Sequence, residues 1–557
     1  MEKRFILFLV LAFAIMIAYP YFIEKLGLFP PPQPSGQTGK VIDKKQSVEK
    51  PTDTTRTQTI QTSSGPADEK TIRVETALYQ AVFTSHGGAL VRLELKNYTG
   101  SDRKTRIKLY EWSPGTIPAF SIQTADAGLN DRLGQGLYSV EGRDVMLNER
   151  YSTGTVVFHY LDPVSGGQIS KRFVFSNDDY RISLDIETTA FPERFLFSIG
   201  TDFGITDWGQ QGGFVGFIGP MTLLDGKLTQ DKPDKIEREI RHEGKIAWTA
   251  LQDKYFIAAA IPTKSGAAVV SRALPKAINA ALEFESAGAG PTAHHVLLYA
   301  GPKEHRRLQA LGVQLEETVD FGWFIYGSWA IVRFIARPLF HILQFFHGFT
   351  GNYGAAIILL TIGVRVIFVP LSHKSYRSMK DMQSLQPQLQ ALQKKYKDDK
   401  QRLQREMMDL YQKHKVNPLG GCLPMLLQIP VFVALFNVLY TTIEIRQAPL
   451  ALWIRDLSDK DPYFVLPILM GLTMFVQQKM QPTTMDPMQA RLFLMMPVLM
   501  TFLFLNFSSG LVLYMLTNNV LTIAQQYFTM KYFEKPHEKA SGKTESGKTP
   551  AAGREKS

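Results

Sequence analysis

Five long apolar stretches in the C-terminal half limit the possible folds of this chain more than any other feature. They cover residues 353–371, 424–440, 463–480, 492–507 and 510–530, and a sixth stretch, residues 5–22, lies near the N-terminus. A helix needs about 20 apolar residues to cross the hydrocarbon core of a bilayer, because each residue advances it by about 1.5 Å. We therefore predict an α-helical polytopic membrane protein with six transmembrane helices, five of which form its core.

The first apolar stretch predicts an uncleaved membrane anchor within residues 1–24. Lys3 and Arg4 precede it, and the sequence "IAYPYFIEK" at its end shows no clear signal-peptide cleavage site. Basic residues beside a span favour the cytoplasm, so the anchor is expected to begin there. Residues 25–70 are rich in Pro, Gly, Thr and Gln and predict a flexible linker, because this composition cannot form a core.

Residues 71–315 show a two-residue alternation that predicts β-strands. In "ALVRLELKNY", Val91, Leu93 and Leu95 alternate with charged residues, and "DDYRISLDIETT" repeats the pattern. Turn residues bound these stretches, as in antiparallel sheets. We predict one large, extracytoplasmic all-β sandwich, long enough to bury its own core.

Residues 316–350 are apolar and aromatic, but Arg333, Arg337 and His341 recur every four residues and form a basic stripe. Crossing the bilayer would bury that stripe at a high cost. An amphipathic helix in the membrane interface avoids this cost, and we predict one here.

Residues 351–533 form the predicted helical core, which includes a polar helical hairpin at about residues 373–416. Leu385, Leu389 and Leu392 lie on one seam of its first arm, and Pro387 is expected to bend that arm. "KDDK" marks the turn between the arms. Residues 534–557 predict a basic, disordered tail.

The distribution of Lys and Arg predicts the orientation in the membrane. The hairpin region 373–416 contains eleven of them, whereas the loop 441–462 contains three. Positive residues favour the cytoplasmic side, so the hairpin and both termini are expected in the cytoplasm and the β domain outside. Six spans agree with both termini being on one side.

Arg365 is the residue that most strongly indicates a function. It lies six residues from the hairpin end of its apolar stretch, about 9 Å deep, and the five core stretches contain no Asp or Glu. A charge at that depth needs water, a lipid phosphate or a visiting acid. Gln428 lies at a similar depth, and polar residues recur along one face of the last stretch.

Together these side chains predict a hydrophilic groove that is open to the cytoplasm and closed towards the outside. Two simpler interpretations remain open: Arg365 could extend to the headgroups, and amides within spans often join helices. The predicted groove residues are Thr361, Arg365, Gln428, Tyr514, Asn518, Thr522 and Gln525.

Two other function classes remain as alternatives. A secondary transporter would call for intramembrane acids or an internal repeat, which we do not find. A membrane-tethered, periplasmic carbohydrate-binding or carbohydrate-processing protein could use histidines of the β domain, such as His242, His294 and His295, although such residues in loops are usually solvated.

The single cysteine, Cys422, is interpreted as an inert buried thiol. We expect no enzymatic activity, no cofactor, no metal and no specific nucleic-acid recognition.

Three stretches carry a resemblance to a known family. "GNYGAAIILLTIGVRVIFVPL", "NPLGGCLPMLLQIPVFVALFNVL" and "FLNFSSGLVLYMLTNN" closely resemble the YidC-type membrane protein insertases, relatives of the mitochondrial Oxa and chloroplast Alb proteins. The resemblance extends over the whole chain, including the anchor, the linker and the β domain of the Gram-negative form.

This resemblance implies an inner-membrane insertase and chaperone that helps nascent membrane proteins to insert and fold, alone or with the Sec translocon. Arg365 matches the arginine of the family's groove, Thr361 and Gln428 match accompanying groove positions, and Tyr514 matches a substrate-contacting one. The implied partners are nascent membrane proteins, the Sec translocon with its accessory subunits, phospholipids, and the ribosome through the cytoplasmic loops and tail. The β domain is expected to resemble the family's periplasmic supersandwich, which is similar to sugar-mutarotase folds.

The chain departs from the family pattern at one turn. The family usually has proline before Ser509, where this chain has Ser508, and Asn506 stands where an aromatic residue is familiar. We assign no role to either residue.

Overall fold

The computed structural model describes most of the chain, which divides into two compact units. The described residues from 330 onwards form one unit, except Thr441–Ile443, which group with the residues before 330 in the other. The described residues are 69–100, 102–201, 203–204, 217–274, 277–319, 321, 323–324, 327–328, 330–396, 399–414, 416, 423–480 and 494–533. The predicted anchor, most of the linker and the basic tail lie outside them, as do Cys422 and part of the "KDDK" turn.

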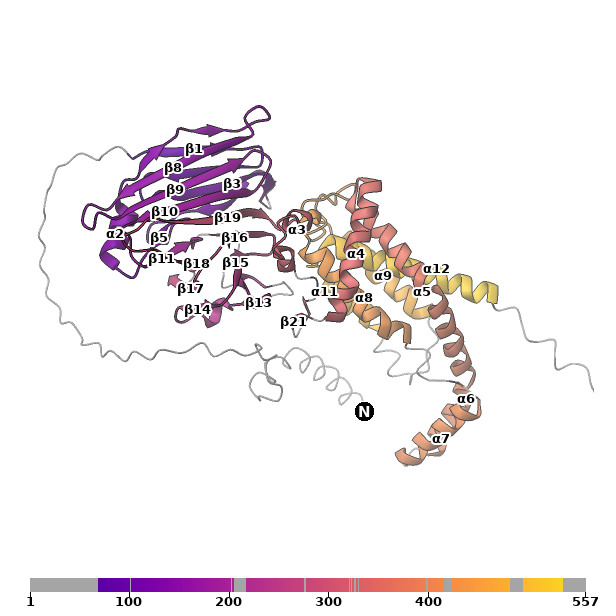
Figure 1. The fold of residues 1–557 in the computed structure, drawn as a ribbon. Helices are drawn as coiled ribbons and strands as arrows, with labels where there is room; N and C mark the ends of the chain where they lie inside the picture. The colour runs from indigo at the N-terminus through magenta and orange to yellow at the C-terminus, as the bar shows by residue number, and fades with distance from the viewer. Residues whose placement is uncertain are drawn as a thin grey trace, which may run out of the picture. The chain divides into compact units, whose positions relative to one another are not determined.

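Three large sheets form most of the first unit, the β unit (Figure 1). The central sheet has nine strands in the order β13 (Lys227–Gln230), β12 (Gly219–Leu224), β15 (Ile246–Gln252), β16 (Phe256–Pro262), β19 (Thr292–Pro302), β10 (Arg181–Thr189), β9 (Gln168–Ser176), β8 (Thr153–Leu161) and β6 (Ser139–Glu141). The second sheet has the order β4 (Arg106–Glu111), β3 (Ala89–Thr99), β2 (Tyr79–Thr84), β1 (Thr71–Glu75) and β7 (Val145–Met146). The third has the order β14 (Ile240–Glu243), β17 (Ala267–Leu274), β18 (Ala277–Glu285), β11 (Arg194–Ser198) and β5 (Ile122–Gln123).

The two smaller sheets pack against different parts of the central one. Phe83 of β2 lies 5.0 Å, between ring centroids, from Phe173 of β9, and β18 contacts β12 and β15. Neighbouring strands are antiparallel except for β1 and β7, which are parallel. The predicted β-rich region is therefore confirmed, with sheets that bury their shared faces.

The predicted alternation is confirmed in β10 and needs a correction in β3. Ile182 and Leu184 of β10 are fully buried, as the pattern requires. In β3, Leu93 and Leu95 are buried, but Val91 is only partly buried and Leu90 takes the inward position. The pairing with β2 shifts register between Val82 and Phe83, so one extra residue of β3 reverses the alternation there.

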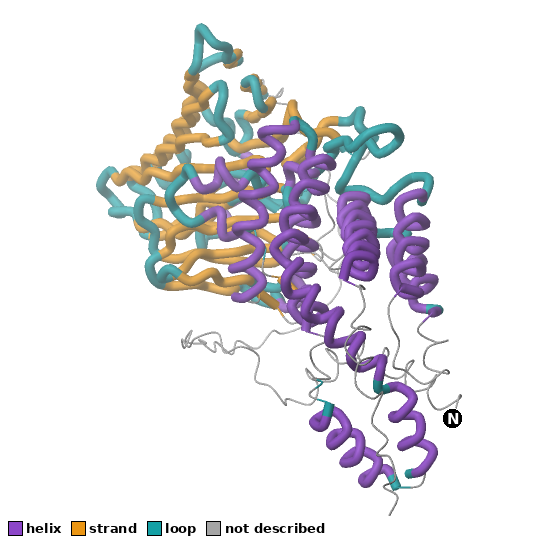
Figure 2. The backbone as a smooth tube through the Cα atoms, turned by 90° about the vertical axis from the view of Figure 1, so that its right-hand side faces the viewer, coloured by secondary structure: helices purple, strands orange, loops and turns teal. Residues whose placement is uncertain are grey.

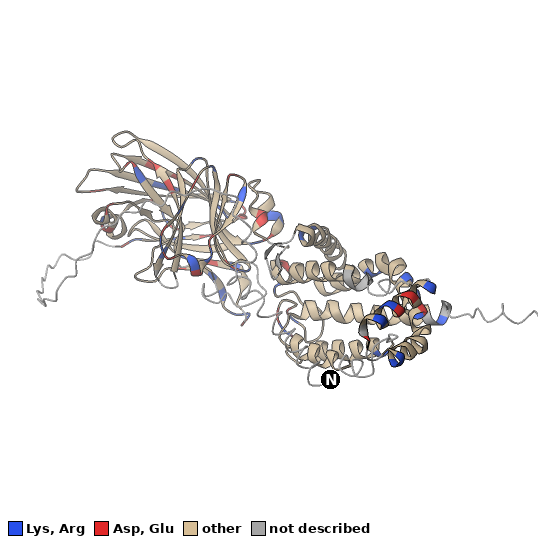
Figure 3. Ribbon diagram, turned by 90° about the horizontal axis from the view of Figure 1, so that it is seen from below, with Lys and Arg blue, Asp and Glu red and all other residues tan. Residues whose placement is uncertain are grey.

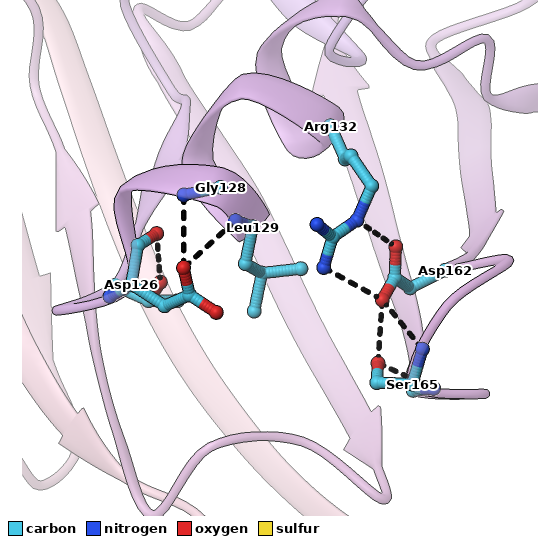
Figure 4. Close-up of polar contacts among 8 residues, drawn as sticks. Asp126, Gly128, Leu129, Arg132, Asp162 and Ser165 are labelled. Atoms are coloured by element: carbon cyan, nitrogen blue, oxygen red, sulfur yellow. Dashed lines mark hydrogen bonds and ion pairs between the residues drawn. The ribbon is translucent and has the colours of Figure 1, made fainter.

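Asp162 is a buried carboxylate of the β unit that has strong partners. Helix α2 (Ala127–Gln135) begins at Asp126, whose side chain accepts from the backbone amides of Gly128 and Leu129, and Arg132 joins it to Asp162 (Figure 4). The Arg132 Nε donates to Asp162 Oδ1 over 2.7 Å. The hydrogen bond from Arg132, with further bonds from Ser165, holds the pKa of the Asp162 carboxyl well below its usual value.

A short segment closes the β unit before the helices begin. It contains α3 (His305–Gln309), a 3₁₀ turn (Leu315–Thr318) and a small hairpin of β20 (Trp323–Phe324) and β21 (Gly327–Ser328). The amphipathic helix predicted over 316–350 consequently starts later, at Ala330. The 3₁₀ turn occupies the first residues of the predicted range, and β20 and β21 lie between it and the helix.

The second unit, the helical unit, consists mainly of helices (Figure 2). Its described helices are α4 (Ala330–Thr350), α5 (Tyr353–Ser384), α6 (Gln386–Lys395), α7 (Lys400–Lys413), α8 (Leu423–Thr441), α9 (Val465–Met480), α11 (Met496–Phe504) and α12 (Ser509–Phe533). Helix α5 packs on α4 and α12, and α9 packs on α11 and α12. A Cβ atom at Gly471 of α9 would clash with Thr501 of α11, so glycine permits that close approach.

The apolar stretches correspond to α5, α8, α9, α11 and α12, with different bounds. Among the described helices, α5 alone is long and apolar enough to cross a membrane, while Leu427–Thr441 and Val465–Met480 are shorter apolar helices. The helix count of six stays a prediction.

Helix α5 continues past its apolar stretch into the first arm of the hairpin. It ends at Ser384, and α6 begins at Gln386 with Pro387 in its first turn, which confirms the predicted bend. The hairpin of α6 and α7 carries many of the charges of the helical unit (Figure 3).

Candidate functional site

Arg365 lies on α5, half-buried, and none of the described carboxylates forms an ion pair with it. Its neighbours are two tyrosines, Tyr376 further along α5 and Tyr514 on α12. The Nε atom of Arg365 is buried and has no hydrogen-bond partner among the described residues. A guanidinium has five N–H donors, so this environment leaves part of its capacity unused.

Gln428 and Tyr514 join α8 to α12 beside this arginine. The Gln428 Nε2 donates to the Tyr514 hydroxyl over 3.0 Å, and Tyr514 is only 2% exposed. Phe432, one turn after Gln428, stacks on the Tyr514 ring. The structure thus brings three predicted residues together around Tyr514, which is hydrogen-bonded to Gln428 and lies close enough to Arg365 for an electrostatic interaction.

The two predicted threonines are hydrogen-bonded within their own helices. Thr361 Oγ1 donates to the Ile357 carbonyl and Thr522 Oγ1 to the Asn518 carbonyl, each over 2.6 Å. Both threonines are buried. Each hydroxyl can still accept a hydrogen bond, but its O–H already donates to a backbone carbonyl. Neither threonine therefore adds a free donor to the site.

Three residues near the site did not enter the prediction: Tyr376, Asn519 and Gln526. Tyr376 lies next to both Arg365 and Gln526, but beyond the predicted end of the span. Asn519 Nδ2 lies 3.5 Å from the Met470 carbonyl of α9. The helical periodicity of the sequence could have identified Asn519 and Gln526 together, because they lie two turns apart on one face of α12.

Gln525 and Gln526 are the other unusual groups of this region. The Nε2 and Oε1 atoms of both side chains are buried without a hydrogen-bond partner among the described residues. A buried polar group left unpaired costs about 1–3 kcal/mol, and folded proteins contain few of them. Partners beyond the described residues, such as water or a bound molecule, would complete such groups.

The end of the helical unit opposite the hairpin is closed by the loop between α8 and α9. Asn352, which caps α5, donates through Nδ2 to the Leu450 carbonyl over 2.9 Å. Ser509 Oγ donates to the Asp459 carbonyl over 2.8 Å, and the Gly510 amide donates to the Leu457 carbonyl, also over 2.8 Å. The loop therefore ties the first residues of α5 and α12 together.

The turn that departs from the family pattern lies at this closed end. Ser508 is buried there, and its hydroxyl has no partner among the described residues.

The histidines of the carbohydrate alternative lie in strands, so their predicted placement in loops was wrong. His242 of β14 lies 2.9 Å from Asp231, and His295 of β19 lies 2.7 Å from Asp185. A cavity of about 170 Å³ near α2 is lined by other residues, among them His86 and Asn130. In the described part of the chain, no three His, Cys, Asp or Glu side chains are grouped to hold a metal ion.

Comparison with known proteins covers both units. The family described as "YidC periplasmic domain" matches residues 71–342, and the family described as "60Kd inner membrane protein" matches residues 345–537. The chain is 38% identical to the membrane protein insertase YidC of Geotalea uraniireducens and 39% identical to that of Citrifermentans bemidjiense. Each alignment covers 95% of this chain and 99% of the relative.

A similar solved structure is a crystal structure of an active YidC insertase with its first transmembrane domain resolved. It has 19% sequence identity and a TM-score of 0.37, and the match covers 83% of this chain and 93% of that one.

Proposed function

The chain belongs to the YidC family of membrane protein insertases, and from this membership we propose that the polar face around Arg365 receives the polar segment of an incoming membrane protein. The protein is an inner-membrane insertase with a helical membrane core and a β-rich periplasmic domain, and nascent membrane proteins are its substrates.

The incomplete environment of Arg365 is the observation that carries this proposal. A half-buried cation beside two tyrosines, with no carboxylate partner among the described residues, attracts an anion that the protein itself does not supply. An acidic segment of a client protein would replace part of its hydration by bonds to Arg365 and to the neighbouring polar groups. These bonds lower the free-energy barrier for the client's polar segment to cross the membrane, and no covalent step is needed.

The apolar segment of the client takes a different path in this proposal. Leu427 and Ile429 of α8 and Val498, Leu499 and Phe502 of α11 are exposed, with Phe502 at 68%. These side chains offer an apolar surface to a client helix and to lipid. The client's hydrophobic part therefore moves along α8 and α11 while its polar part occupies the site.

The remaining features follow the predicted orientation. In this proposal six spans cross the membrane, both termini lie in the cytoplasm, and α4 lies in the interface. Several apolar residues of α4 are exposed beside its basic stripe, among them Phe334 and Phe345. The proposed partners also include the ribosome, which binds the cytoplasmic loops and tail, the Sec translocon, with which the β domain is associated, and phospholipids.

Replacing the arginine tests the proposal. Arg365→Ala should lower the insertion of clients with acidic tails by about ten-fold or more, while clients with neutral tails lose less. Arg365→Lys should retain partial function, because the site needs a positive charge more than a bidentate fork. The assay compares client insertion into proteoliposomes that contain each full-length variant.

Lys479→Ala is the matched control, because it removes an exposed cation of the same unit. It should leave the ratio between acidic and neutral clients unchanged. Undiminished insertion of acidic-tailed clients by Arg365→Ala would reject the proposal.

A further inference from the structure

Two adjacent glutamines near the C-terminal end of α12 carry amide groups that are not completed within the described protein. Gln526 is 3% exposed, and neither its Nε2 nor its Oε1 has a hydrogen-bond partner. The amide atoms of Gln525 are buried and unpartnered in the same way. Gln526 lies beside Tyr376, which in turn lies beside Arg365, so Gln526 adjoins the proposed site. Gln525 follows Tyr514 by eleven residues, which places both on one face of α12.

A purely structural role in joining helices accounts for a different amide of α12. Asn519 lies within 3.5 Å of the Met470 carbonyl and 3.4 Å of Thr473 Oγ1, both on α9. Amides that hold membrane helices together make such contacts. Gln525 makes no such contact among the described residues. Gln526 lies beside Tyr376 of α5, but neither of its amide atoms has a partner within hydrogen-bond geometry.

The chemistry of an amide side chain suggests what completes these groups. Each glutamine offers donors through Nε2 and acceptor sites through Oε1, whereas Arg365 offers donors only. A peptide group also has one donor and one acceptor, so it is complementary to a glutamine whatever side chain it carries. Arg365 therefore suits an anion, and the glutamine pair suits a polypeptide main chain.

We propose that Gln525 and Gln526 form a subsite that hydrogen-bonds main-chain peptide groups of the client's polar segment. This inference rests on the proposed function, because it requires that segment to enter the site beside Arg365. It divides recognition into two parts: Arg365 responds to the charge of the client, and the glutamine pair binds any extended chain. Such a division suits an insertase that accepts clients of different sequence.

The test uses the full-length double variant Gln525→Leu, Gln526→Leu in proteoliposomes. Three clients are compared that differ only in an acidic, neutral or basic tail. Insertion of all three should fall by a similar factor, about five- to ten-fold, since the lost hydrogen bonds do not depend on tail charge. The melting temperature should stay the same or rise, because leucine removes unpaired buried polar atoms.

Asn519→Leu is the matched control. It removes a partnered amide from the same helix, so it should lower the melting temperature without an equal loss of insertion per folded molecule. Unchanged insertion by the glutamine double variant, or a loss confined to the acidic tail, would overturn the subsite.

A second measurement covers the case in which the double variant does not fold. A photoreactive residue at position 526 should crosslink to neutral and acidic tails alike, and crosslinks to acidic tails alone would reject the inference. The proposed function has a separate test: it is rejected if Arg365→Ala leaves the insertion of acidic-tailed clients unchanged. The glutamine subsite is tested by the insertion of the neutral-tailed client in the double variant.

Discussion

Each unit of the molecule holds a basic side chain without a carboxylate partner among the described residues, but Lys171 and the half-buried Arg365 are held differently. Lys171 of β9 is fully buried, and its Nζ donates to the carbonyls of Gly87 at 2.9 Å and Phe120 at 3.2 Å. The Tyr138 ring lies 5.0 Å from the same atom. Arg365 has two tyrosine neighbours and an unpartnered Nε.

This difference separates a basic group that the fold itself satisfies from the one that, in our proposal, binds a substrate. The β unit surrounds Lys171 with fixed acceptors, so nothing outside the protein is needed to complete it. The helical unit leaves Arg365 incomplete, which destabilises the empty site and favours any anion that enters it. A charged group inside a protein indicates a binding function only when other groups of the same chain do not supply its hydrogen bonds or its counter-charge.

Supplying a resident anion to Arg365 should have the largest effect, because it makes the two cations alike. Thr361 lies one turn before Arg365 on α5, where an acidic residue pairs well with an arginine four positions later. Thr361→Asp should lower the insertion of acidic-tailed clients by roughly 100-fold, which corresponds to about 2.7 kcal/mol. This is less than the roughly 4 kcal/mol expected for opposite charges 4 Å apart near a protein surface.

Thr361→Asn controls for the change in size and hydrogen bonding. It introduces no charge and should reduce insertion only slightly, while Thr361→Asp should also raise the melting temperature. Both variants are measured with the same acidic-tailed and neutral-tailed clients. If Thr361→Asp inserts the acidic-tailed client normally, insertion does not require Arg365 to lack a carboxylate partner.

The β unit provides a smaller effect, which appears as a pH dependence. Burial lowers the pKa of Lys171 to about 7, whereas an unfolded lysine has a pKa of about 10.4. Between these pH values the unfolded chain binds more protons, so Lys171 makes the free energy of unfolding rise with pH. The slope is at most about 1.4 kcal/mol per pH unit and disappears below pH 7.

Lys171→Met should remove this slope, as measured by chemical denaturation of the full-length protein between pH 7 and 9. The control Lys264→Met changes an exposed lysine, whose ammonium stays in water in both states, and should keep the slope. An unchanged slope in Lys171→Met would mean that Lys171 is not held in a dry environment.

The sequence was sufficient to identify Arg365 as an isolated charge in an apolar helix, but not to identify the residues around it. A single charge in a long apolar stretch is visible without a structure, and so is the i, i+4 spacing that places Tyr514 and Asn518 on one face of α12. Tyr376 was missed because hydropathy falls after residue 371, whereas α5 continues as one helix to Ser384. Helical hydrogen bonding does not stop where the apolar composition does.

Other features depend on long-range pairing that periodicity does not encode. The bulge that turns Val91 outward arises from the pairing of β3 with β2. Lys171 shares the inward row of β9 with Ile169 and Phe173, but the acceptors that make a lysine tolerable there come from distant residues, Gly87 and Phe120. Similarly, only the packing of α5 against α12 places Gln526 beside Tyr376.

The most direct test of the incomplete site is photocrosslinking from position 428 to a ribosome-bound nascent membrane protein, with Arg365 retained. Gln428 contacts Tyr514 next to Arg365, so a probe there reports on occupancy without removing the charge. Our account predicts crosslinks to the polar tail of the client, with a yield for acidic tails that falls several-fold in Arg365→Ala. Crosslinks to lipid alone, or a yield for acidic tails that is the same with and without Arg365, would contradict it.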